Sequence, residues 1–232
     1  MKVFALLISF VLLVGCHSSN RTEISDKVEP TYFEGEIYYS ISYDLVPSYL
    51  SEESLKSTLG AKMVLIYKNG NHRKEIYSSN GDLISTRYLD LSQNKSFSFD
   101  EKDSTITWFD IRKPDTQLTF SSLNDTLVEN EKCLILKTTF LTPNPRNKSE
   151  NFEVKSTFIN SQKLAVNPDW FKEYLEGNFN ELIKKTQSLS IEIHTYGPFW
   201  NTKQIADSII WRKVDDKELK VPKIKGQKMI EL

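Results

Sequence analysis

Histidine and cysteine are scarce in this 232-residue chain, which has three histidines and two cysteines. The histidines do not lie at metal-ligand spacing from one another, from a cysteine or from a carboxylate; they are His17, His72 and His194. The G-x-S-x-G, P-loop and G-x-G-x-x-G signatures are absent too. The sequence therefore predicts no metal site, no cofactor and no enzymatic activity.

An excess of one charge is also missing, because 30 Lys and Arg residues face 31 Asp and Glu residues and leave a net charge of −1. Proteins that bind nucleic acid carry a clustered basic excess, so we expect no nucleic-acid partner. Aromatic residues are plentiful at 12%, with 10 Tyr and 13 Phe, and such side chains suit the faces of a β-sheet.

The only long apolar run covers residues 3–14, and it is too short to cross a bilayer core, which needs about 20 residues. It follows Lys2 and fits the apolar region of a secretory signal. The closing Leu13-Val14-Gly15-Cys16 resembles the lipobox of bacterial lipoproteins. The resemblance implies a signal peptide over residues 1–15 and acylation of Cys16, whereas the alternative is an ordinary signal with a chance cysteine.

The segment that follows predicts how a lipid anchor would be used. Residues 16–32 are polar beyond the cysteine and indicate a flexible tether. In the enterobacterial sorting pattern an Asp after the acylated cysteine retains the protein in the inner membrane, and this chain has His17 there. We therefore expect an outer-membrane anchor facing the periplasm. With Cys16 acylated no intrachain disulfide is possible, and Cys133 is expected to be a small buried residue.

Residues 33–222 predict a single β-rich domain. In the first strand, residues 33–43, every second side chain is apolar. Residues 51–60 predict a short helix between Ser51 and Gly60. Further strands are predicted at residues 63–67, 72–79, 83–91, 96–99, 105–111, 119–120, 126–128, 132–140, 152–159, 189–196 and 205–214. Asn80-Gly81 predicts a type I′ turn with positive φ at both residues, and residues 223–232 are expected to form a polar tail.

A second helix is predicted after Asn167, with Pro168 at its first position. Its aromatic and apolar residues recur at helical spacing as far as residue 183, and Gly177-Asn178 can divide it into two pieces. Such a wide apolar face must cover something, most simply one face of the sheet.

The order of these pieces resembles the envelope lipoproteins of Bacteroidota related to the GLPGLI group and, more loosely, the LolA/LolB-type lipoprotein carriers. The resemblance covers the layout of most of the mature chain, with Glu131-Lys132-Cys133 and Val221-Pro222 as its motifs; the GLPGLI hexapeptide itself is absent. It implies a mainly β (α+β) fold: a strongly curved antiparallel sheet or half-barrel with one or two helices packed on its concave side. In the carriers that concavity is apolar and receives acyl chains.

We therefore expect a non-catalytic, membrane-anchored periplasmic lipoprotein that binds a lipid, an acyl chain or another apolar ligand in a groove. Trp170, Tyr174 and Phe179 are the candidate ligand-binding residues. One alternative is an envelope scaffold or protein-interaction module whose own helix fills the groove. A less favoured one is an envelope hydrolase, because paired carboxylates can be far apart along the chain. No protein partner is indicated.

Gly197-Pro198-Phe199-Trp200 predicts a loop. Exposed Trp and Phe side chains favour the membrane interface, so Phe199 and Trp200 are candidate membrane contacts. The alternative is that both side chains fold back onto the edge of the sheet.

Overall fold

The computed structural model describes residues 31–45, 50–100, 105–114, 117–144, 150–222 and 228–232. The predicted signal peptide, Cys16 and the tether as far as Pro30 lie outside these ranges. Everything below concerns the unit that begins at Thr31.

Twelve strands form one sheet. The first six are β1 (Gly35–Leu45), β2 (Lys62–Lys68), β3 (Asn71–Tyr77), β4 (Leu83–Asp90), β5 (Lys95–Asp100) and β6 (Thr105–Asp110). The other six are β7 (Gln117–Val128), β8 (Glu131–Pro143), β9 (Asn151–Ala165), β10 (Ser188–Tyr196), β11 (Trp200–Trp211) and β12 (Lys228–Glu231). The helical elements are α1 (Glu52–Thr58), α2 (Phe179–Thr186) and the 3-10 turns η1 (Pro168–Phe171), η2 (Glu176–Asn178) and η3 (Asp216–Leu219).

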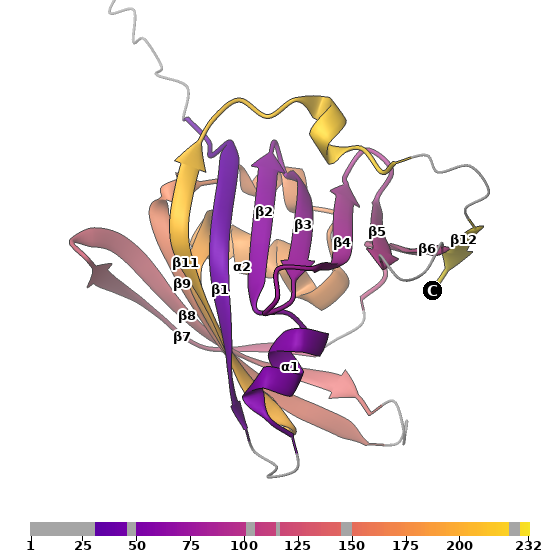
Figure 1. Cartoon of the computed structure of the whole chain (residues 1–232). Helices are drawn as coiled ribbons and strands as arrows, with labels where there is room; N and C mark the ends of the chain where they lie inside the picture. The colour runs from indigo at the N-terminus through magenta and orange to yellow at the C-terminus, as the bar shows by residue number, and fades with distance from the viewer. Residues whose placement is uncertain (1–30, 46–49, 101–104, 115–116, 145–149, 223–227) are drawn as a thin grey trace, which may run out of the picture. The chain divides into compact units, whose positions relative to one another are not determined.

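The sheet consists of two antiparallel meanders that meet where β1 pairs with β11. Its order is β12-β6-β5-β4-β3-β2-β1-β11-β10-β9-β8-β7, so β12 and β7 are free edges and the sheet is not closed. It curves strongly, as Figure 1 shows, and α2 lies behind β2 and β3 in that view. The predicted curved sheet with helices on its concave side is confirmed.

The junction between the meanders depends on a glycine at the start of β1. Gly35 has φ of +153°, and a Cβ there would lie 2.0 Å from the backbone oxygen of Ile210 on β11. Only glycine allows the two backbones to approach so closely. Further along β1 the predicted alternation is confirmed, because Ile37, Tyr39 and Ile41 are all buried.

The helices follow their predicted signals, with one change. Ser51 caps α1 by accepting a hydrogen bond from the Ser54 amide, and Asn167 caps η1 by accepting one from the Asp169 amide. The second predicted helix is not continuous. Gly177 and Asn178 both adopt left-handed backbone angles, so the chain makes two 3-10 turns before the eight-residue α2 begins.

Two predicted local features differ in the structure. Gly81 has φ of +87° but Asn80 is not in the left-handed region, so Asn80-Gly81 is not a type I′ turn. Asn69 and Gly70, between β2 and β3, do have positive φ at both positions. The two short strands predicted at residues 119–120 and 126–128 are parts of the single strand β7, which has a register shift between Phe120 and Ser122.

The C-terminal segment departs from the expected polar tail. The expectation that ordered structure ends at Pro222 is wrong, because β12 pairs in parallel with β6. Every residue of β12 is exposed, and this strand is bound through backbone hydrogen bonds rather than burial, which is why no apolar alternation marks it in the sequence.

The two faces of the sheet are used differently. The inner face, defined by Tyr39, Met63 and Leu65, packs with α1, η1 and α2 into the main hydrophobic core. The outer face is its opposite side. A smaller buried cluster lies there around Tyr88, Phe97 and Ile106, with Val221 from the C-terminal segment packed against it.

Candidate ligand-binding site

A cavity of about 100 Å³ lies between the inner face and α2. Both meanders and the helix contribute apolar walls to it. These walls are Tyr39, Met63 and Leu65 from β1 and β2, Leu136, Phe158 and Ile193 from β8, β9 and β10, and Phe179, Leu182 and Ile183 from α2. A space enclosed by apolar side chains from three directions is suited to a hydrocarbon group.

The predicted aromatic residues lie together, but only one of them borders the cavity. Phe179 lines it, and Tyr174 packs against Phe179 with ring centroids 4.9 Å apart. Trp170 lies further out, edge-to-face with Tyr32 at 5.1 Å. Phe171, which is fully buried, takes the place expected for Trp170 and lines the cavity. The break at Gly177 rotates the two helical pieces relative to a continuous helix, so helical spacing alone could not identify the lining residues.

Most polar groups on the wall of the cavity bond to the protein itself. The Ser190 hydroxyl donates to the Asn160 side-chain oxygen at 2.8 Å, and the Asn160 amide donates to the backbone oxygens of Leu134 and Phe158. The Ser188 hydroxyl donates to the backbone oxygen of Thr186. These side chains are therefore satisfied without a ligand.

Two side chains on the wall differ. The buried Tyr67 hydroxyl has no hydrogen-bond partner in the described part of the chain. Lys74 lines the cavity from the middle of β3, and no hydrogen bond or ion pair to a described residue holds its ammonium. Burial and, to a smaller extent, the charge of Arg87 lower the pKa of Lys74 to about 8, while Glu176 acts in the opposite direction. Its neighbour on the wall, His72, has its pKa lowered well below the usual value by burial and is neutral at pH 7.

A second cavity of about 420 Å³ shares Lys74 with the first and has a mixed lining. Its walls combine the apolar Ile76 and Phe99 with hydroxyl side chains of β4, β5 and β6, namely Ser85, Thr86, Ser98, Thr105 and Thr107. Arg87 also lines it, and its guanidinium donates to Glu176 Oε1 at 2.6 Å and lies 5.0 Å from the centre of the Phe109 ring. Lys74 therefore stands between an apolar cavity and a wider one whose walls also carry hydroxyl groups.

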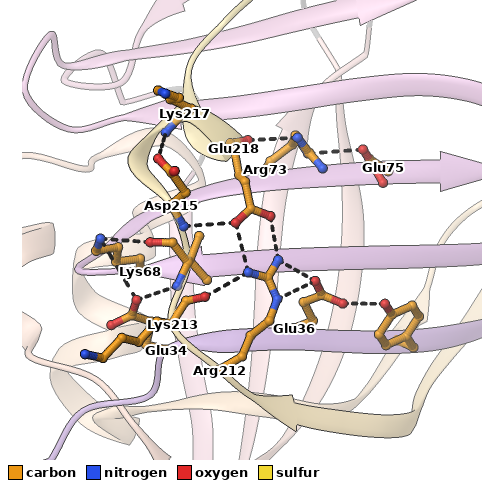
Figure 2. A network of polar contacts seen from close by, with 12 residues as sticks. Glu34, Glu36, Lys68, Arg73, Glu75, Arg212, Lys213, Asp215, Lys217 and Glu218 are labelled. Atoms are coloured by element: carbon orange, nitrogen blue, oxygen red, sulfur yellow. Dashed lines mark hydrogen bonds and ion pairs between the residues drawn. The ribbon is translucent and has the colours of Figure 1, made fainter.

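The outer face carries a polar network in which Arg212, Lys68 and Arg73 each bind oxygen atoms of the protein (Figure 2). Arg212 donates to Glu36 at 2.7 Å and to both oxygens of Glu218, at 2.9 and 2.5 Å. Lys68 bonds to the Val214 backbone oxygen and to Asp216. Hydrogen bonds from Arg212 hold the pKa of the Glu218 carboxyl at about 2. This network attaches η3 to the sheet.

The two candidate membrane contacts lie at different depths. Trp200 begins β11 opposite Leu45 and packs against the main core. Phe199 is 42% exposed and lies edge-to-face with Phe152, with centroids 5.5 Å apart. Trp200 is half-buried, and Phe199 is the more exposed of the two although it packs on Phe152; a membrane contact of either side chain stays a prediction. Cys133 is a buried free thiol, as expected.

Among the described residues, no group of three or more His, Cys, Asp or Glu side chains is placed to hold a metal ion. None of the helices in the described ranges has the length and apolar character needed to cross a membrane. Neither the known protein-family models nor the curated proteins contain a match to this chain.

Proposed function

We propose that this protein is a non-catalytic lipoprotein of the bacterial envelope that binds an acyl chain, or a ligand of similar apolar character, between its curved sheet and α2. The observation that carries the proposal is the apolar cavity, to which both meanders and the helix contribute walls. The lipobox-like segment around Cys16 supports a membrane anchor, and His17 supports a periplasm-facing outer membrane location. The resemblance to GLPGLI-related and LolA/LolB-type lipoproteins supports the same function.

The size of the cavity indicates how a ligand would enter. Ligand pockets are usually about 300–1,000 Å³, so a cavity of about 100 Å³ has to enlarge before it accepts a chain. Helix α2 is suited to move, because it has eight residues and is flanked by Asn178 and Gln187, both in left-handed conformations. No side chain caps its N-terminus. In the proposed cycle α2 shifts outward when the ligand enters and closes the site when it leaves.

A scaffold or protein-interaction module is the second candidate function. The small volume of the cavity favours it, because α2 and its aromatic neighbours already fill most of the concave side. The two functions differ in one measurable respect: only the first requires the cavity to be occupied by another molecule.

Native mass spectrometry of the full-length protein, extracted from membranes in nanodiscs, tests the choice. We expect bound lipid or fatty acid in the wild type and its loss in Ile193→Trp, which fills the cavity from β10. Ile205→Trp is the matched control, because Ile205 pairs with Glu192 and lies on the opposite face of the sheet from Ile193. A wild-type protein that carries no ligand after gentle extraction would contradict the proposal and favour the scaffold.

The anchor requires its own test. Metabolic labelling with radioactive palmitate should mark the wild-type protein, and Cys16→Ser should abolish the label, because the thiol is the proposed acceptor. Labelling that persists in Cys16→Ser, or its absence in the wild type, would remove the anchor from the proposal.

A further inference from the structure

We propose that the ligand is a single-chain amphiphile with an anionic head group, a fatty acid, and that the Lys74 ammonium binds its carboxylate. The inference rests on the proposed function, because it places the acyl chain in the same apolar cavity. It adds the chemical class of the head group, the residue that selects it and the direction in which the ligand lies.

The position of Lys74 sets the direction of the ligand. Lys74 pairs with Leu65 of β2 on one side and with Arg87 of β4 on the other. Leu65 lines the first, apolar cavity and Arg87 lines the second. A chain lying in the first cavity with its head at Lys74 therefore points that head into the second, where water and hydroxyl groups can solvate it.

The charges at this boundary favour an anion. Arg87 is already bound by Glu176, so these two side chains nearly neutralise each other. His72 is neutral, and the charge of Lys74 is left without a partner in the described part of the chain. A partly buried charge without a counterion is unfavourable, so a carboxylate that supplies one gains the energy of a charge-assisted hydrogen bond in a site of low dielectric.

The surrounding hydroxyls complete the head-group site. Ser85 and Ser98 on β4 and β5 lie on the same face as Lys74, as the register from Lys74 to Arg87 to Ser98 shows. Thr107 pairs with Ser98 and continues this row onto β6. The Thr107 hydroxyl donates to the Ser98 backbone oxygen at 3.5 Å and can still accept from water, whereas the Ser85 and Ser98 hydroxyls can donate to the carboxylate.

A single chain fits better than a diacyl lipid. The apolar cavity is small even before α2 moves, and one cation stands at its mouth to meet one carboxylate. A two-chain lipid would require twice the apolar volume while offering the same single contact to Lys74.

The test uses the full-length protein in phosphatidylcholine nanodiscs and three probes with the same ten-carbon chain and a diazirine near its end. The probes are the carboxylate, the alcohol and the trimethylammonium. Crosslinked peptides are located by mass spectrometry. We expect the carboxylate to label cavity residues of α2 at least tenfold more than the other two probes. Lys74→Met should reduce that labelling about tenfold, and Lys74→Arg should restore most of it.

Lys62→Met is the control variant, because Lys62 is an exposed lysine on the neighbouring strand β2 and does not line either cavity. It should leave labelling unchanged. If all three probes label the cavity equally and Lys74→Met changes nothing, the head-group inference is overturned while the proposed function stands. If no probe labels the cavity in any variant, the proposed function fails as well.

Discussion

Arg73 and Lys74 are neighbours on β3, yet their side chains point to opposite faces of the sheet and meet opposite conditions. On the outer face Arg73 donates to the Glu218 backbone oxygen at 2.9 Å and forms an ion pair with Glu75 at 3.1 Å. On the inner face Lys74 has no such partner among the described residues. On the outer face Arg73, Arg212 and Lys68 bind protein oxygens that hold η3 to the sheet, whereas on the inner face Lys74 is left available.

Arg73 and Lys74 differ because a buried charge that stabilises the fold needs a partner within the protein, whereas a buried charge that binds a ligand must be left available to it. A cation whose partners are protein carboxylates contributes to folding at all times. A cation kept without a partner destabilises the empty protein and is satisfied only when an anion arrives. The three predictions below test whether the two faces differ in this way.

The largest effect is expected from Arg212→Met on the outer face. This change removes the guanidinium that donates hydrogen bonds to both Glu36 and Glu218. The two carboxylates are then left near each other without a cation between them. Because Arg212 is partly exposed, the free energy of unfolding should fall by less than it would for a fully buried ion pair. We expect a decrease of about 2–3 kcal/mol. Thermal unfolding of the full-length protein in nanodiscs, followed by tryptophan fluorescence, should show a Tm lower by about 5–10 °C.

The control for that variant is Arg112→Met. Arg112 pairs with Asp110 two residues away, and its side chain is 52% exposed. An exposed local pair contributes little to the free energy of unfolding, so Tm should barely change. Equal losses in both variants would mean that the outer network does no more than an ordinary surface ion pair.

The second prediction has the opposite sign. Lys74→Met should raise the stability of the ligand-free protein by about 1–2 kcal/mol, because methionine fills similar volume without a charge that must be desolvated. The protein has to be freed of bound lipid first, since a ligand that binds only the folded state stabilises the wild type. A Tm that falls in Lys74→Met, with Lys62→Met unchanged, would show that Lys74 supports the fold instead.

Much of the fold follows from local sequence patterns. The alternation at Ile37, Tyr39 and Ile41 predicts β1 and its buried face, and Asn167-Pro168 predicts the start of η1. Patterns of this kind report burial and capping, which are local. The parallel strand β12 was missed because all of its side chains are exposed, and β7 was predicted as two fragments because its alternation shifts at Phe120.

The candidate site was less accessible from sequence, because it is made by pairing between distant strands. Phe179 lies on the predicted helix, but Leu136 and Ile193 reach the cavity only through the register of β8, β9 and β10. The strand predicted over residues 72–79 contains Lys74, and its alternation with Arg73 places the two side chains on opposite faces. Without the pairing partners that pattern does not say which face is buried.

The smallest expected effect concerns pH, and it separates the two faces. On the outer face the folded pKa of Glu218 is lowered to about 2 from an ordinary 4.5, so the unfolded chain binds more protons between these values. The stabilisation that Glu218 provides is complete above pH 4.5 and is lost as pH falls towards 2. Tm of Arg212→Met should therefore depend less on pH between 5 and 3 than Tm of the wild type.

On the inner face the folded pKa of Lys74 is lowered to about 8 from 10.5, so the unfolded chain again binds more protons, now between pH 8 and 10.5. In that window the contribution of Lys74 to the free energy of unfolding rises with pH. The rise is about 1 kcal/mol between pH 8 and 9. The advantage of Lys74→Met over wild type should shrink accordingly, because the wild-type lysine loses its charge. Arg87, Glu176 and His72 face Lys74 and are identical in both proteins, so their titration largely cancels in the difference. A difference that stays constant from pH 7 to 10 would mean that the Lys74 ammonium is already solvated, and the contrast between the two faces would then lose its physical basis.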